Sequence, residues 1–88
     1  MNKLEQARLT IEEVDKEMVE LFEKRFKAVK DVIDYKIENN LSINDTGREE
    51  FLINKNLGYL QDKALEKYYI EFLQNIFIVS KKYQSDIN

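Results

Sequence analysis

The sequence contains no cysteine, no histidine and no proline, and it has only two glycines, Gly47 and Gly58. The lack of cysteine excludes disulfide bonds, thiolate-bound metals and a cysteine nucleophile. Without histidine, the chain also lacks the commonest general base and the commonest metal ligand in proteins. Any catalytic chemistry must therefore use carboxylates, lysine, arginine, hydroxyls and amides.

Long apolar runs and a dominant charge sign are also missing. No apolar run approaches the roughly 20 residues needed to span a membrane, and the polar start, Met1 to Arg8, does not resemble a signal peptide. The net charge is −3, with 14 basic and 17 acidic residues mixed along the chain. We therefore expect a cytoplasmic protein that binds neither membrane nor nucleic acid, in which an anionic ligand needs a local cluster of positive side chains.

Apolar residues at helical spacing predict an all-α fold of three helices, and a length of 88 residues predicts a single domain, residues 1–88. A first helix is expected from about Lys3 to about Asn39. The segment Thr46-Gly47-Arg48-Glu49 matches the capping-box pattern and predicts a second helix from Thr46 to Leu57, with Gly58 at its C-cap. Asp62 is expected to cap a third helix that runs to about Tyr83.

The first predicted helix is too long for a chain of this size. About 37 residues span roughly 55 Å, whereas a compact domain of this length has a radius of gyration of about 12 Å. We therefore expect a second copy of the chain to bury the apolar stripe of the helix. The alternative is a kink or break near residues 27–30, although this segment contains neither glycine nor proline.

Charged residues interrupt the apolar row along this helix, which is Leu4, Arg8, Ile11, Asp15, Met18, Phe22, Arg25, Val29, Val32 and Lys36. Because arginine is rarely buried without a partner, Arg25 is expected either to form a buried salt bridge, with Glu49 or Asp15, or to bind an anion. Lys36 lies on the same face about 16 Å further along the axis, so the two cations could hold a small dianion between them. Alternatively, Lys36 is a helix-end lysine whose amine reaches solvent.

Two further features depend on spacing. Arg8 lies about 26 Å from Arg25 along the axis, so it is either a solvated residue near the helix end or a contribution to the site of the other protomer. In the third helix, the apolar stripe of Leu73 and Phe77 continues into Ser80 and Gln84. Their hydroxyl and amide either bind one ligand together or mark the emergence of the helix into solvent.

One ordered set of residues spans nearly the whole chain: Ile11-x-x-Val14-Asp15-x-x-Met18-Val19-x-Leu21-Phe22-x-x-Arg25, then Lys36, then Asp45-x-x-Arg48-Glu49, then Ser80 and Gln84. This set resembles the all-helical class of chorismate mutases. The resemblance implies an isomerase of aromatic amino acid biosynthesis, in the shikimate pathway, that rearranges chorismate to prephenate. It also implies a three-helix protomer in an intertwined homodimer with two equivalent sites, and no cofactor or metal.

The resemblance implies a role for each matching residue. Arg25 binds one substrate carboxylate, and Arg8 reaches across from the partner to bind the other. Lys36 and Gln84 donate hydrogen bonds to the ether oxygen of the breaking C–O bond, so these two and Arg25 are the predicted catalytic residues. Glu49 accepts a hydrogen bond from the ring hydroxyl, with help from the backbone near Asp45. The carboxylate-binding shell is completed by Ser80 and Arg48.

Two other functions remain possible on this sequence. An isochorismate–pyruvate lyase has a similar scaffold and a similar cationic pocket, although the position of Glu49 favours a mutase. A non-catalytic helical dimerisation or binding module is the second alternative. It predicts that the charges of the apolar row pair internally and leave no pocket.

Overall fold

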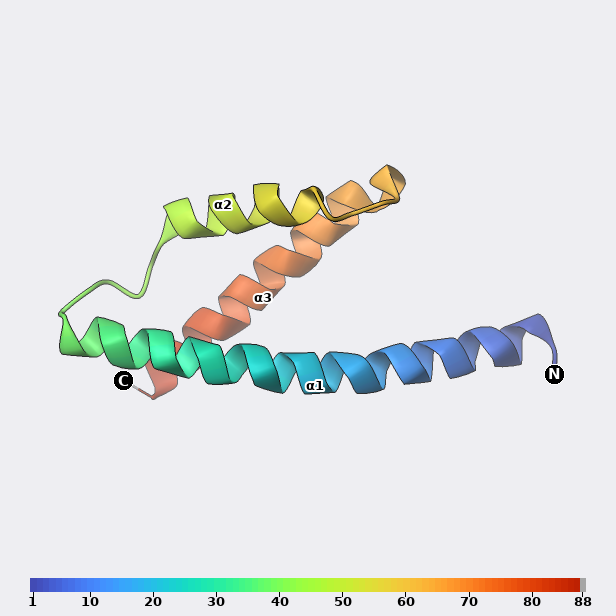
Figure 1. Ribbon diagram of the computed structural model, residues 1–88, viewed down its shortest axis with the longest axis horizontal. Helices are drawn as coiled ribbons and strands as arrows, with labels where there is room; N and C mark the ends of the chain where they lie inside the picture. The colour runs from blue at the N-terminus through green and yellow to red at the C-terminus, as the bar shows by residue number, and fades with distance from the viewer. Residues whose placement is uncertain (88) are drawn as a thin grey trace.

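The structure, a computed structural model, describes residues 1–87 as three α-helices and one short 3-10 turn (Figure 1). Helix α1 spans Lys3–Glu38, α2 spans Thr46–Leu57, the turn η1 spans Lys63–Leu65, and α3 spans Glu66–Asp86. The all-α prediction is confirmed, and each predicted helix ends within a few residues of its expected bounds. Within residues 1–87, none of the helices is both long enough and apolar enough to cross a membrane.

Helix α1 runs unbroken for 36 residues, so the alternative of a break near residues 27–30 is wrong. Its first turn is closed by Asn2, whose side-chain oxygen accepts a hydrogen bond from the backbone N–H of Glu5 at 2.8 Å. Its C-cap is Asn39, and Asn40 follows with a φ of 55°. Asparagine tolerates this left-handed conformation better than most residues, and the helix therefore ends where the sequence predicts.

The start of α2 differs from the prediction. The N-cap is Asp45, whose carboxylate accepts a hydrogen bond from the backbone N–H of Arg48 at 2.9 Å, while Thr46 is already the first helical residue. The predicted capping box of Thr46 and Glu49 is therefore wrong. Aspartate is a stronger N-cap than threonine, and it leaves the Glu49 side chain free for another partner. Gly58 is the C-cap as predicted, with a right-handed φ of −65°.

Helix α3 joins the other elements and forms the small core. Asp62 accepts a hydrogen bond from the N–H of Ala64 at 3.0 Å and so caps η1, which leads directly into α3. Helix α3 then crosses to pack against both α2 and α1 (Figure 1). The buried apolar side chains are Ile33 from α1 and Leu73 and Phe77 from α3. These contacts fix the C-terminal half of α1 against α3.

The N-terminal half of α1 extends away from this core (Figure 1). The radius of gyration is 16.2 Å, against about 12 Å for a compact domain of this length, and the molecule measures 55 × 25 × 16 Å. Large apolar side chains along this half are exposed in the single chain, among them Leu4, Ile11, Val14 and Met18. The predicted overshoot of the first helix beyond its own domain is therefore present.

Candidate active site

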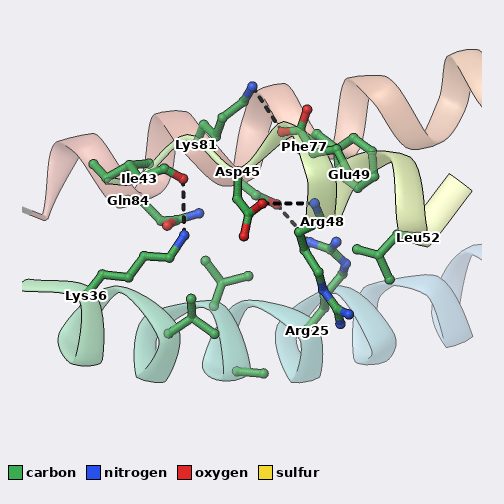
Figure 2. Close-up of a pocket in the computed structure, with 14 residues that line it drawn as sticks. Arg25, Lys36, Ile43, Asp45, Arg48, Glu49, Leu52, Phe77, Lys81 and Gln84 are labelled. Carbon is green, nitrogen blue, oxygen red and sulfur yellow. Dashed lines mark hydrogen bonds and ion pairs between the residues drawn. The ribbon is translucent and has the colours of Figure 1, made fainter. Parts of the chain in front are cut away.

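A cavity of about 330 Å³ lies between the C-terminal half of α1, the connection to α2, the start of α2 and the end of α3 (Figure 2). This volume falls within the range of small-molecule sites in proteins. The lining includes seven of the eight residues that the sequence analysis selected, which are Arg25, Lys36, Asp45, Arg48, Glu49, Ser80 and Gln84. The eighth, Arg8, lies on the exposed N-terminal part of α1 and does not line the cavity.

Arg25 lies at one end of the cavity, where its Nη1 donates a hydrogen bond to the Ser80 hydroxyl at 2.8 Å. Within residues 1–87, Arg25 forms no salt bridge, so the alternative of a buried ion pair with Glu49 or Asp15 is wrong. A neutral hydroxyl orients the guanidinium without cancelling its charge. The remaining N–H groups of Arg25 are therefore available to an anion.

Ser80 and Gln84 are both buried, with 5% and 8% of their surface exposed. The alternative that α3 emerges into solvent at these residues is wrong, because α3 continues to Asp86 and packs this face against α1. Among the described residues, the Gln84 Oε1 atom is buried without a hydrogen-bond partner. Such a group is unfavourable when left unpaired, and Gln84 is one of the residues that line the cavity.

Lys36 lies at the other end of the cavity, three helical turns from Arg25. Its Nζ donates a hydrogen bond to the backbone carbonyl of Ile43 at 3.2 Å, and the side chain is half-buried. The alternative that this amine reaches out to solvent is therefore wrong. The contact also ties the end of α1 to the connection before α2, as Figure 2 shows. An ammonium has three donors, so two remain for a ligand.

The start of α2 supplies the third wall of the cavity. Asp45 is committed through its carboxylate to capping the helix. Arg48 is exposed, and its guanidinium carbon lies 5.1 Å from the centroid of the Phe51 ring. Glu49 is half-buried and faces α3 (Figure 2). These three residues line the same cavity as Arg25 and Lys36.

One charged residue of the cavity was missed by the sequence analysis. Lys81 lines the cavity, and its Nζ lies 3.1 Å from the Glu49 Oε2 atom. A signal was present, because Lys81 follows Phe77 by four residues and so lies on the same side of α3. With Lys81 included, the cavity has four cationic side chains and two carboxylates, a balance that favours an anionic ligand.

Other charged groups lie apart from the cavity. The Asp34 carboxylate accepts a hydrogen bond from Lys30 on the exposed face of α1 and, with its negative charge, raises the pKa of that lysine above its ordinary value. In the part of the chain that the structure describes, no group of three or more acidic, histidine or cysteine side chains is arranged to hold a metal ion.

Comparison with known proteins agrees with this geometry. The chain matches the model of the family described as chorismate mutase type II over residues 7–85. It is similar to a chorismate mutase of Methanocaldococcus jannaschii, with 29% identity over 94 aligned residues that cover 85% of this chain and 95% of the relative. No solved structure matches the chain significantly.

Because the family match covers residues 7–85, nearly the whole sequence, the chain belongs to the chorismate mutase type II family. It is an enzyme of the isomerase class with chorismate mutase activity, and this places it in aromatic amino acid biosynthesis. The alternative of a non-catalytic helical module required internally paired charges and no pocket. The open cavity and the uncompensated charge of Arg25 contradict both requirements.

Proposed function

We propose that the cavity between α1, α2 and α3 is the site where chorismate is rearranged to prephenate, and that a second copy of the chain completes it. The observation that carries this proposal is the convergence of eight polar and charged side chains, from all three helices and the N-cap of α2, on one small cavity with an excess of positive charge. Chorismate carries two carboxylates, a ring hydroxyl and an ether oxygen. The lining of the cavity offers cations for the carboxylates, a carboxylate for the ring hydroxyl, and hydrogen-bond donors for the ether oxygen.

The reaction is an intramolecular Claisen rearrangement, in which one C–O bond breaks and one C–C bond forms within a single molecule. It requires no proton transfer and no covalent intermediate. The protein must hold the flexible enolpyruvyl arm over the ring, which is an effect of orientation. It must also stabilise the negative charge that develops on the ether oxygen, which preorganised donors in a site shielded from water can do.

Lys36 and Gln84 are the proposed donors to the ether oxygen. Lys36 enters from α1 and Gln84 from α3, so they approach the same region of the cavity from two helices (Figure 2). The hydrogen bond from Lys36 to the Ile43 carbonyl holds the ammonium in place before substrate arrives. Because this order exists in advance, little reorganisation is needed in the transition state.

Arg25 is the proposed ligand of one substrate carboxylate. Its hydrogen bond to Ser80 at 2.8 Å presets the guanidinium, and Ser80 joins the same shell. Arg48 completes this shell from the first turn of α2. Glu49 accepts a hydrogen bond from the ring hydroxyl, together with backbone groups near Asp45. These assignments follow the roles that the family resemblance implies, and all of these residues line the same cavity.

The second carboxylate requires Arg8, which cannot reach the cavity of its own chain. Helix α1 is unbroken between Arg8 and Arg25, which places them about 26 Å apart along the axis. We therefore propose an intertwined homodimer, in which Arg8 of each copy enters the cavity of the other.

The apolar surface of the single chain supports the same dimer. The exposed apolar side chains of α1 continue into a groove of about 460 Å³ between α1 and α3, which is lined by Met18, Leu21, Phe22, Phe26, Phe72, Ile76 and Val79, with Arg25 and Asn75 at its edge. A second α1 helix carries the apolar stripe needed to fill this groove. Arg25 borders both the groove and the cavity, so a chain seated in the groove lies next to the site. The proposal takes residues 1–88 as one catalytic domain, acting in the cytoplasm.

The direct test is to supply the purified protein with chorismate and, separately, with isochorismate. We expect prephenate from chorismate, and a loss of this conversion in Arg25→Ala. Pyruvate release from isochorismate at a comparable rate would instead assign the scaffold to a lyase. Failure to consume either compound by a folded protein would overturn the proposed function.

A further inference from the structure

The ion pair between Lys81 and Glu49 connects two helices across the rim of the cavity (Figure 2). The Lys81 Nζ lies 3.1 Å from the Glu49 Oε2 atom, and the two side chains are 34% and 26% exposed. This pair differs from the pair of Lys30 and Asp34, which joins residues one turn apart on a single helix with both side chains 55% exposed. The interhelical pair is the better shielded of the two and lies on the cavity itself.

Lys81 contacts the Glu49 side chain, which does not take part in capping its own helix. In a capping box, Glu49 would be tied back to the N-cap backbone, but Asp45 is the N-cap here, and it bonds to the N–H of Arg48. The contact that the structure gives the Glu49 carboxylate is the one to Lys81. The orientation of Glu49 at the cavity therefore depends on α3 and not on its own helix.

The geometry leaves the second carboxylate oxygen for the substrate. A carboxylate only accepts hydrogen bonds and offers lone pairs on both oxygens. Lys81 engages Oε2, so Oε1 remains the acceptor for a hydroxyl in the cavity. Without Lys81, the carboxylate would rotate more freely and lose this fixed direction.

Charge balance gives Lys81 a second effect through the same contact. A dianionic substrate is repelled by a carboxylate in the cavity, and this repulsion grows as water is excluded. The Lys81 ammonium offsets the Glu49 charge directly at 3.1 Å. Glu49 can then accept a hydrogen bond from the ring hydroxyl without opposing the entry of the substrate carboxylates.

We propose that Lys81 is a positioning residue for the mutase reaction, acting on the substrate through Glu49. This inference rests on the proposed function, because the role of Glu49 toward the ring hydroxyl belongs to it. Lys81 fixes the direction of the Glu49 carboxylate and compensates its charge. It makes no direct contact with the reacting atoms.

The test compares Lys81→Met with Lys81→Arg, using Lys82→Met as the matched control. Lys82 is the next residue on α3, is exposed and does not line the cavity, so its replacement removes the same charge at the same end of the helix. Because the pair is partly exposed, we expect a moderate effect, with Lys81→Met raising KM for chorismate about 10-fold. Lys81→Arg restores most of the loss, and Lys82→Met leaves both constants unchanged.

The ratio of effects on KM and kcat separates positioning from a structural role. The hydrogen bond to the ring hydroxyl exists in both the ground state and the transition state, so its loss raises KM and leaves kcat largely intact. A variant that only unfolds in part would instead lose active enzyme and show a lower kcat with the KM of the wild type. That second pattern overturns the proposal.

A double-mutant cycle with Glu49→Gln tests whether Lys81 acts through Glu49. If it does, adding Lys81→Met to Glu49→Gln changes KM by less than about twofold, because the interaction is already lost. Independent, multiplying effects would mean that Lys81 contacts the substrate itself, which contradicts the proposal. A wild-type protein without mutase activity refutes the proposed function, whereas an active wild type with a silent Lys81→Met refutes only this inference.

Discussion

Mixing two inactive variants is the sharpest test of the shared site. Each site of the proposed dimer takes Arg25 from one chain and Arg8 from the other. Removing one partner of a buried charge pair costs about 2–5 kcal/mol, or about 30- to 5,000-fold in affinity. Arg8→Ala and Arg25→Ala homodimers should therefore each show a few per cent of wild-type kcat/KM or less.

Mixed dimers of these two variants should recover a predictable share of activity. In such a dimer, one site has neither arginine, while the other takes the intact Arg25 of one chain and the intact Arg8 of its partner. Random pairing of equal amounts makes about half of the dimers mixed, so about one quarter of all sites are complete. Because α1 is continuous from Lys3 to Glu38, no rearrangement within a single chain brings the two arginines together.

The assay mixes the two unfolded variants in equal amounts, refolds them and follows the loss of chorismate. The matched control mixes Arg25→Ala with Lys36→Ala, because both residues line the cavity of the same chain and every mixed dimer then lacks one of them at each site. We expect about one quarter of wild-type activity from the first mixture, as random pairing requires, and none above background from the control. A first mixture that shows only the average of its two components would refute the shared site and the dimer together.

Three further predictions concern single residues. Lys36→Ala should lower kcat by about 100- to 1,000-fold, as expected for the loss of one preorganised donor, with little change in KM. Near-wild-type turnover of this variant in steady-state kinetics would contradict the role assigned to Lys36. Ile33 is only 1% exposed, so Ile33→Ala should lower the free energy of unfolding by about 2–5 kcal/mol, measured by urea denaturation. A loss of stability well below that range would mean that neighbouring side chains move to fill the space left at position 33. Asp45→Ala should lower the free energy of unfolding by about 0.5–2 kcal/mol, because α2 loses its N-cap. Asp45→Asn should retain most of the stability, since asparagine is also a good N-cap. Equal losses in the two variants would argue against the capping role.

Local patterns were sufficient to predict most of the helices. The end of α1 at Asn39 and Asn40 depends on the tolerance of asparagine for a left-handed conformation, which is a property of the residue itself. The start of α2 shows the limit of such patterns. Thr46 and Glu49 match the capping box by spacing, but Asp45 stands one residue earlier and is the stronger cap. Several residues in that segment can each serve as a cap, and the competition between them is decided by the backbone conformation.

The candidate site was predictable as a set of residue types, though not as a set of contacts. Arg25, Lys36, Ser80 and Gln84 were selected because polar residues interrupted apolar rows, and all four line the cavity. Their partners did not follow from spacing. Arg25 bonds to Ser80 and not to Glu49, because the crossing of α3 over α1 places a hydroxyl beside the guanidinium. Lys81 was overlooked for the same reason, since its partner belongs to another helix.

The helical class, the lengths of the helices and the residue types available for chemistry follow from the amino-acid sequence alone. These depend on periodicity, on caps and on the lack of cysteine and histidine, all of which are local or compositional. Which cation meets which acceptor depends instead on how the helices pack, because contacts between helices depend on crossing angles that no single helix encodes. The burial of Ser80 and Gln84, the free oxygen of Gln84 and the pairing of Glu49 with Lys81 all arise from α3 packing against α1 and α2.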